Sequence, residues 1–241
     1  MKVDLIDILL FVLIVQMISF AMFLFFSNSR RMIQPGKILA FFLIAKSLCV
    51  SNFLSFRQSS YFYEHFPHLF YFGSSFTILF GPLLYFYVKS LLYRDFKFKP
   101  VYWLHLFPFL IHFSYLLFKF HVFDADTKRE LLSAGTAVIF SPSVSLGLSI
   151  ALYLYILIYT LTSIRLLYQY KRRLEDHYAN LEQVYFNWIS LVLYGFLMKW
   201  LADIWYLYEV YVNGDYQGPG LIVSRLILFL LINIMIFKAL R

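Results

Sequence analysis

Seven long apolar stretches, separated by short polar segments, dominate the pattern of hydrophobic positions along this chain. A helix needs about 20 apolar residues to cross roughly 30 Å of hydrocarbon, and each stretch has this length or comes close to it. We predict spanning helices at Leu5–Ser27, Ile38–Phe56, Leu69–Leu91, Val101–Phe120, Ser143–Leu167, Phe186–Tyr208 and Leu221–Phe237. The alternating ten-residue segments of a membrane barrel are absent from the sequence. The predicted fold class is therefore all-α, a single domain over residues 1–241 that forms a bundle of seven transmembrane helices.

The first apolar stretch could also be a secretory signal peptide, but its flanks favour a retained helix. It begins with Asp4 and Asp7 rather than with a basic cluster, and Arg30 and Arg31 follow it. It is also longer than the apolar core of a typical signal peptide.

Basic residues predict the direction of the spans, because cytoplasmic loops carry an excess of Lys and Arg. The larger set follows the first, third, fifth and seventh spans: Arg30, Arg31, Lys37, Lys89, Arg94, Lys97, Lys99, Arg165, Lys171, Arg172, Arg173, Lys238 and Arg241. The opposite side carries only Lys2, Arg57, Lys119, Lys128 and Arg129. We therefore expect the N-terminus outside and the C-terminus in the cytoplasm.

The segments between the spans carry further signals. A short helix is expected on the outer side around residues 128–134. The charged stretch 171–183 has helical composition and could extend the fifth span along the headgroups. Gly81-Pro82 should bend the third span, and the glycines of Asn213-Gly214-Asp215 and Gly218-Pro219-Gly220 predict a tight link between the last two spans.

Composition changes this picture little. Hydrophobic residues make up 61% of the chain and charged residues 14%, so much of the surface must face lipid. The net charge of +8 fits contact with anionic headgroups, and we expect this chain to bind no nucleic acid. The single cysteine, Cys49, excludes a disulfide framework.

Charged groups within the spans are the candidate functional residues, because burial of charge in a bilayer is costly. The set predicted to form a ligand site or a buried polar network is Lys46, Asn52, Lys199, Asp203, Glu209 and Arg225. In the structural interpretation, Lys199 pairs with Asp203 four residues on, and Asp203 or Glu209 meets Arg225. In the functional interpretation, the cations outnumber the midspan acid and leave room for an anionic or amphiphilic ligand from the outer side.

Other chemistries have weaker support. His105 and His112 are seven residues apart, whereas a helical metal pair prefers three or four, so we expect no metal site. The seventh span has no central lysine for a retinal Schiff base, since Lys238 lies at its end. We expect no cofactor and no enzyme activity. A small ion- or proton-coupled transporter and a lipid-modifying enzyme that uses His105 or His112 remain alternatives.

Two stretches carry a family resemblance. One is Phe80-Gly-Pro-Leu-Leu-Tyr-Phe-Tyr-Val-Lys-Ser-Leu91, followed by a basic loop and Trp103-Leu-His-Leu-Phe-Pro108. The other is Tyr170-Lys-Arg-Arg-Leu-Glu-Asp-His-Tyr-Ala-Asn-Leu-Glu182, followed by Asn187-Trp-Ile189. Together they resemble the N-terminal seven-helix membrane domain of bacterial AraC-type transcriptional regulators, over about residues 30–241.

The resemblance implies a sensory, signal-relaying domain in the bacterial inner membrane, and a homodimer is plausible because such regulators commonly bind paired sites. In that family the seventh helix leads into a helix-turn-helix domain that binds DNA. The present sequence stops at Arg241, just after the seventh span, so we expect either an excised membrane domain or a natural short relative.

Overall fold

The computed structural model describes residues 4–26, 33–93, 95–135, 139–175 and 183–239. Within these residues, seven helical segments are long and apolar enough to cross a membrane: Leu5–Phe26, Gln34–Arg57, Pro67–Leu92, Pro100–His121, Pro142–Arg173, Phe186–Val212 and Pro219–Phe237. The predicted fold class, an all-helical chain with seven membrane spans, is confirmed. The described residues cluster into two compact units, each built from separate stretches of the chain.

The first unit comprises residues 1–26, 40–80 and 97–152. It contains α1 (Leu5–Phe26), most of α2 (Ile33–Arg57), α3 (Ser59–His65), α5 (Phe107–Leu116) and α6 (Ala125–Ser133). Short 3₁₀ helices lie at Pro67–Leu69, Ser75–Leu79 and Pro100–Leu106, and a π-helical turn, Leu117–His121, continues α5. The short helix expected near residues 128–134 therefore exists, beginning three residues earlier.

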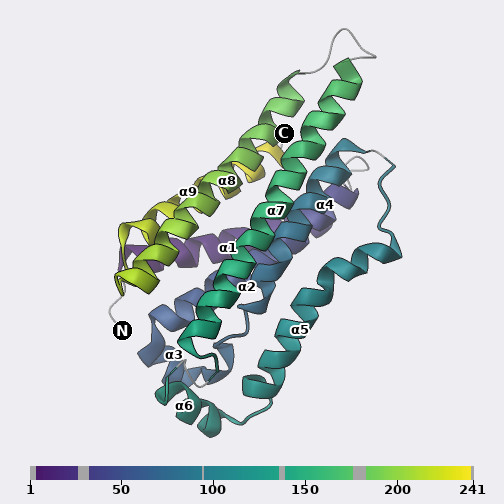
Figure 1. The fold of residues 1–241 in the computed structure, drawn as a ribbon. Helices are drawn as coiled ribbons and strands as arrows, with labels where there is room; N and C mark the ends of the chain where they lie inside the picture. The colour runs from purple at the N-terminus through teal and green to yellow at the C-terminus, as the bar shows by residue number, and fades with distance from the viewer. Residues whose placement is uncertain (1–3, 27–32, 94, 136–138, 176–182, 240–241) are drawn as a thin grey trace. The chain divides into compact units, whose positions relative to one another are not determined.

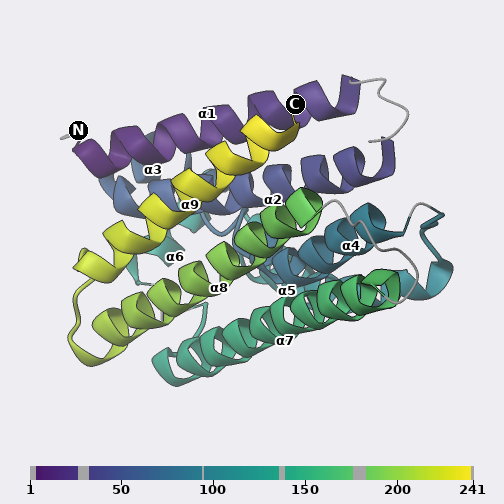
Figure 2. The ribbon, with the colours of Figure 1, turned by 90° about the horizontal axis from the view of Figure 1, so that it is seen from above.

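The second unit comprises residues 27–39, 81–96 and 153–241. It contains almost all of α4 (Phe80–Leu92), most of α7 (Pro142–Glu175), and the whole of α8 (Gln183–Val212) and α9 (Pro219–Ala239). Figure 1 and Figure 2 show α8 and α9 lying side by side. The link between them is tight, as predicted, and Gly214 adopts a φ of 67°, which a glycine accommodates without strain. Of the predicted amphipathic stretch 171–183, residues 171–175 belong to α7, and residues 176–182 lie outside the described residues.

The third span differs from its prediction. Residues 67–79 form 3₁₀ turns and bends, and the α-helix begins only at Phe80. Pro82 therefore stands in the first turn of α4, where a helix tolerates proline. Gly73 allows the preceding turn to touch α2, since a Cβ at this position would overlap the carbonyl oxygen of Leu48.

Tyr71 in the same turn has a φ of 62°, which is uncommon for a residue with a Cβ and stores strain. Its ring packs edge-on against Phe56 and Phe120, with ring centroids 5.1 Å away in each case. These contacts, with Phe70, Leu116 and Ile139, form a hydrophobic cluster that holds the strained turn in place.

Candidate functional site

A cation, a carboxylate and a hydroxyl join α8 to α9 inside their membrane spans. The Lys199 ammonium donates to the Asp203 carboxylate, and the Ser224 hydroxyl of α9 donates to the other oxygen of the same carboxylate. Lys199 Nζ also lies 3.4 Å from Ser224 Oγ. Lys199 is 5% exposed and Ser224 1% exposed. The network therefore neutralises a buried charge and connects two helices, as a buried ion pair requires.

Glu209 closes the end of the same helix pair at which α8 joins α9. Its carboxylate accepts the backbone N–H of Gly220, at 3.0 Å and 3.2 Å for its two oxygens. Gly220 is the second residue of α9, so the acid lies where the helix dipole favours negative charge. A Cβ at Gly218 would overlap this carboxylate, which explains the glycine there. Arg225 is half-buried one turn further into α9.

Lys46 and Asn52, the other two predicted residues, belong to α2 in the first unit, whereas Lys199, Asp203, Glu209 and Arg225 belong to the second unit. The Lys46 ammonium lies 3.7 Å from the centroid of the Phe80 ring, a cation–π contact, and the residue is 7% exposed. Asn52 is half-buried, and its side-chain oxygen has no hydrogen-bond partner among the described residues.

A third polar group, which sequence reasoning missed, lies in the first unit beyond the end of α2. We call residues 59–69 and 117–133 the cap: α3, the 3₁₀ turn Pro67–Leu69, the π-helical turn and α6. Its parts touch one another, α6 against both the 3₁₀ turn and α3. The Lys128 ammonium in α6 donates to His68 Nδ1 at 2.7 Å and to the His121 carbonyl oxygen at 2.9 Å.

Lys128 is only 2% exposed, so its ammonium lies within the cap. Burial lowers its pKa below the usual lysine value, and the negative charge of Asp124 partly opposes this shift. The Phe120 ring, 5.7 Å from Nζ, covers the ammonium on another side. No local pattern reveals the contact with His68, because the two residues are 60 positions apart.

Two further interactions fix α6 to its surroundings. Asp124 is the N-cap residue, and its side chain accepts the backbone N–H of Thr127 at 2.9 Å. Hydrogen bonds from Thr127 hold the pKa of the Asp124 carboxylate below its usual value. Arg129 donates to the carbonyl oxygens of Tyr63 and Glu64 in α3, at 3.3 Å and 2.9 Å.

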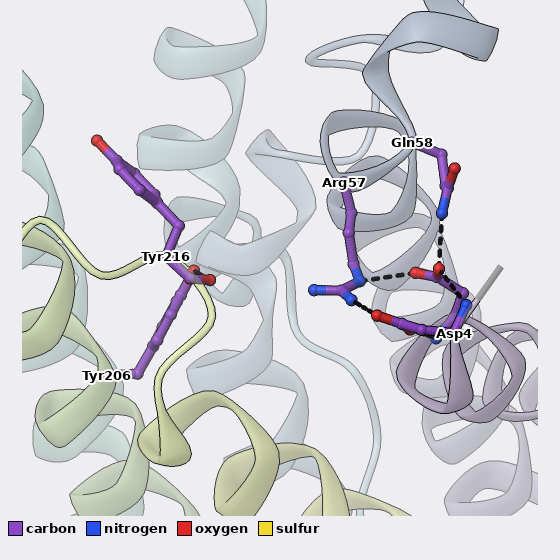
Figure 3. Close-up of polar contacts among 6 residues, drawn as sticks. Asp4, Arg57, Gln58, Tyr206 and Tyr216 are labelled. Atoms are coloured by element: carbon purple, nitrogen blue, oxygen red, sulfur yellow. Dashed lines mark hydrogen bonds and ion pairs between the residues drawn. The ribbon is translucent and has the colours of Figure 1, made fainter. Parts of the chain in front are cut away.

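Arg57, at the end of α2, links the residues just before the cap to the start of α1. Its guanidinium binds Asp4 and, at 2.6 Å, Asp7, and Gln58 donates to the second oxygen of Asp7 at 2.6 Å (Figure 3). Asp4 and Asp7 also accept each other's backbone N–H, at 3.0 Å and 3.1 Å, which closes the N-terminal turn of α1. In the second unit, Figure 3 also shows Tyr206, whose hydroxyl donates to the Tyr216 carbonyl oxygen at 3.4 Å.

The histidines of the fourth span are placed separately. His112 Nδ1 lies 2.8 Å from the buried Ser75 hydroxyl, which makes it a packing residue between α5 and a 3₁₀ turn. His105 lies in the preceding 3₁₀ helix, Pro100–Leu106. Among the described residues, no three His, Cys, Asp or Glu side chains are grouped as metal ligands would be.

These observations define the class of protein: a multi-pass helical membrane protein with buried charged networks in its spans and a folded polar cap. Comparison of the chain with protein-family models, with curated proteins and with solved structures finds no match.

Proposed function

We propose that this chain is the membrane-embedded sensory domain of a bacterial transcriptional regulator and relays a signal from its outer side to its cytoplasmic end. The distribution of basic residues supports an inner-membrane orientation with the N-terminus outside. In this orientation the cap faces the outside and α9 ends in the cytoplasm. The resemblance of the stretches 80–108 and 170–189 to AraC-type sensor domains supports the same role.

The observation that carries the proposal is the polar connection between the last two spans. The Lys199–Asp203–Ser224 network lies within the helix pair, and the Glu209–Gly220 contact lies at its end. Gly195 lets the Leu231 side chain of α9 pack against the backbone of α8, because a Cβ there would overlap this side chain. Movement of α8 is thereby passed to α9, the span that leads to the cytoplasmic end of the chain.

A signal requires two states of the domain and a ligand with different affinity for each. An anionic or amphiphilic small molecule is one candidate ligand, since the spans contain the basic residues Lys46, Lys199 and Arg225. A homodimer fits the proposal, because paired output domains would bind paired DNA sites.

A proton-coupled carrier is the second candidate, and the charged residues within the spans favour it over an enzyme. The test combines transcript profiling with a flux assay. In the source organism, we expect chromosomal deletion of the coding region to change a defined set of transcripts, and Ser224→Ala, which removes one hydroxyl from the network, to change the same set. Asp126→Asn, on the exposed face of α6, is the control and should leave the transcripts unchanged.

Purified protein in proteoliposomes should show no proton-coupled flux of solutes. Unchanged transcripts after deletion, together with such a flux, would contradict the sensor and support the carrier.

A further inference from the structure

The acceptors of the Lys128 ammonium set it apart from the other buried cations of known partner. Arg57 and Lys199 each bind a carboxylate, and Lys46 lies over the Phe80 ring. The two acceptors of Lys128 are an imidazole nitrogen and a backbone carbonyl oxygen, and both are neutral. An imidazole nitrogen accepts a hydrogen bond only while it lacks a proton. The contact between His68 and Lys128 therefore exists only while His68 is uncharged.

His68 is exposed, whereas Lys128 behind it is buried. His68 is the second residue of the span Pro67–Leu92, so its exposed ring lies at the end of a span, where water can reach it. Once the ring is protonated, both of its nitrogens are hydrogen-bond donors, and Nδ1 faces an ammonium that is also only a donor. The hydrogen bond is lost, and two positive charges would lie 2.7 Å apart in a partly buried place. Separation of the 3₁₀ turn Pro67–Leu69 from α6 relieves this repulsion.

We propose that the His68–Lys128 pair is a proton-binding site, at which protonation of His68 releases α6 from the rest of the cap. Only the closed cap holds Lys128 against the ring, so protonation of the ring destabilises the closed cap and not the opened one. Acidification therefore favours opening, and return to neutral pH restores the closed form. The idea that the proton is the stimulus of a sensor rests on the function proposed above, whereas the opening of the cap does not.

The cap contains these other titratable or charged groups: Tyr61, Tyr63, Glu64 and His65 from α3, Lys119 and His121 from the π-helical turn, and Asp124, Asp126, Arg129 and Glu130 from α6 and its N-cap. Asp124 attracts Lys128 but stays charged through mild acid, since its pKa lies below the usual value. Arg129 is charged at every relevant pH and holds α3 through backbone carbonyls.

His65 is the histidine nearest to His68 in the sequence. Its ring stacks on Tyr61 and its Nδ1 lies 3.0 Å from the Tyr61 carbonyl oxygen. His65 therefore serves as a matched control, being an exposed histidine of the cap with a contact to its own helix rather than to Lys128.

The test is hydrogen exchange of the α6 amides, with the protein in lipid nanodiscs at about pH 7.5 and about pH 5.5, on either side of the ordinary imidazole titration. Rates are corrected for the intrinsic effect of pH on exchange. We expect protection of α6 to fall by about tenfold or more on acidification. His68→Gln keeps an acceptor for Lys128 but cannot be protonated, so its α6 should stay protected at both pH values.

Lys128→Met is the second variant, and it keeps the test valid if His68→Gln does not fold. It removes the buried cation, so protonation of His68 no longer opposes a charge and the acid response should disappear. His65→Gln should respond as the wild type does. Equal protection of the wild type at both pH values would overturn the proposal, as would an acid response that survives in His68→Gln or Lys128→Met or is lost in His65→Gln. Because this readout is structural, its failure leaves the sensor proposal open to the transcript test, and failure of that test leaves the proton site intact.

Discussion

Lys128 in the cap and Lys199 in α8 are both almost completely buried, but their partners differ in chemistry. Lys199 binds a carboxylate on its own helix, and that carboxylate also binds Ser224 of the next helix. Lys128 binds a neutral imidazole from a distant turn. The first arrangement pairs the cation with a negative charge, whereas in the second the proposed response depends on the protonation of a histidine. The partner of a buried cation therefore decides whether the site connects helices permanently or responds to its surroundings.

The two regions also differ in their surroundings. The Lys199 network lies within apolar spans, where no water is present to solvate an unpaired charge. The cap consists of the ends of two spans, residues 67–69 and 117–121, and of the segments 59–66 and 122–133 next to them, and His68 is exposed. Loss of a partner should therefore cost more in the α8–α9 pair than in the cap, and four predictions test this difference.

The largest effect is expected at Asp203. Asp203→Ala leaves the Lys199 ammonium buried without its carboxylate, and we expect the free energy of unfolding to fall by about 3–5 kcal/mol. Titration with SDS in mixed micelles measures this change. The double variant Lys199→Met/Asp203→Leu removes both charges and should lie within about 1 kcal/mol of the wild type. If the single variant is as stable as the double, the network does not hold α8 to α9.

The next effect is expected at Gly195, where α8 meets α9. Gly195→Ala places a Cβ against the buried Leu231 side chain, and the overlap should cost about 1–3 kcal/mol in the same titration. Gly147→Ala in α7 is the control. A Cβ there meets nothing within 4 Å, so the substitution should raise stability by about 0.5–1 kcal/mol through helix propensity alone. Equal behaviour of the two variants would contradict the close approach of α8 and α9.

A smaller effect is expected at Arg57, the link between α2 and α1. Arg57→Lys keeps the charge but loses the planar fork that reaches Asp4 and Asp7 together, so stability should fall by about 0.5–1.5 kcal/mol. Because Asp4 is about half exposed, this loss should shrink at high salt, whereas the loss in Asp203→Ala should not. A loss at Arg57 that salt leaves unchanged would show that the link is as shielded as the α8–α9 network.

The smallest effect concerns Asp124, and its sign follows from its pKa. Hydrogen bonds in the folded cap lower the pKa of Asp124 from its ordinary value of 3.8, so this carboxylate stabilises α6 above that pH and ceases to do so as the pH falls through the lower, folded value. Hydrogen exchange of α6 should therefore show a second loss of protection only in strong acid. Asp124→Asn should lack this second loss while retaining the loss that depends on His68. A single acid transition that Asp124→Asn abolishes would assign the response to the helix cap instead.

Local patterns in the sequence predicted much of this molecule. Length and hydropathy predicted all seven spans, because a helix must have a minimum apolar length to cross the bilayer, whichever other helices it packs against. The spacing of Lys199 and Asp203 placed them on one face, and the glycines between residues 213 and 220 indicated the tight link. Each of these features lies within a few residues along the chain.

Other features depend on contacts between distant segments. The length of the apolar stretch did not distinguish the α-helix α4 from the 3₁₀ turns before it, because both segments are apolar in sequence. Gly73 and its two following serines were the available signal of a break. His68 and Lys128 gave no signal at all, because tertiary packing alone brings them together. Ser224, a small polar residue in an apolar stretch, was likewise overlooked as the partner of Asp203.

The orientation of the cap is the claim on which the sensor account depends most, and cysteine labelling in intact cells measures it directly. In a Cys49→Ser background, Glu130→Cys places a thiol on the exposed side of α6, and Arg241→Cys places one at the end of the chain. A membrane-impermeant maleimide that can cross only the outer membrane should label the thiol at position 130 in intact cells and the thiol at position 241 only after the inner membrane is permeabilised. The reverse pattern would put the cap in the cytoplasm and contradict both the relay and an external proton as its stimulus.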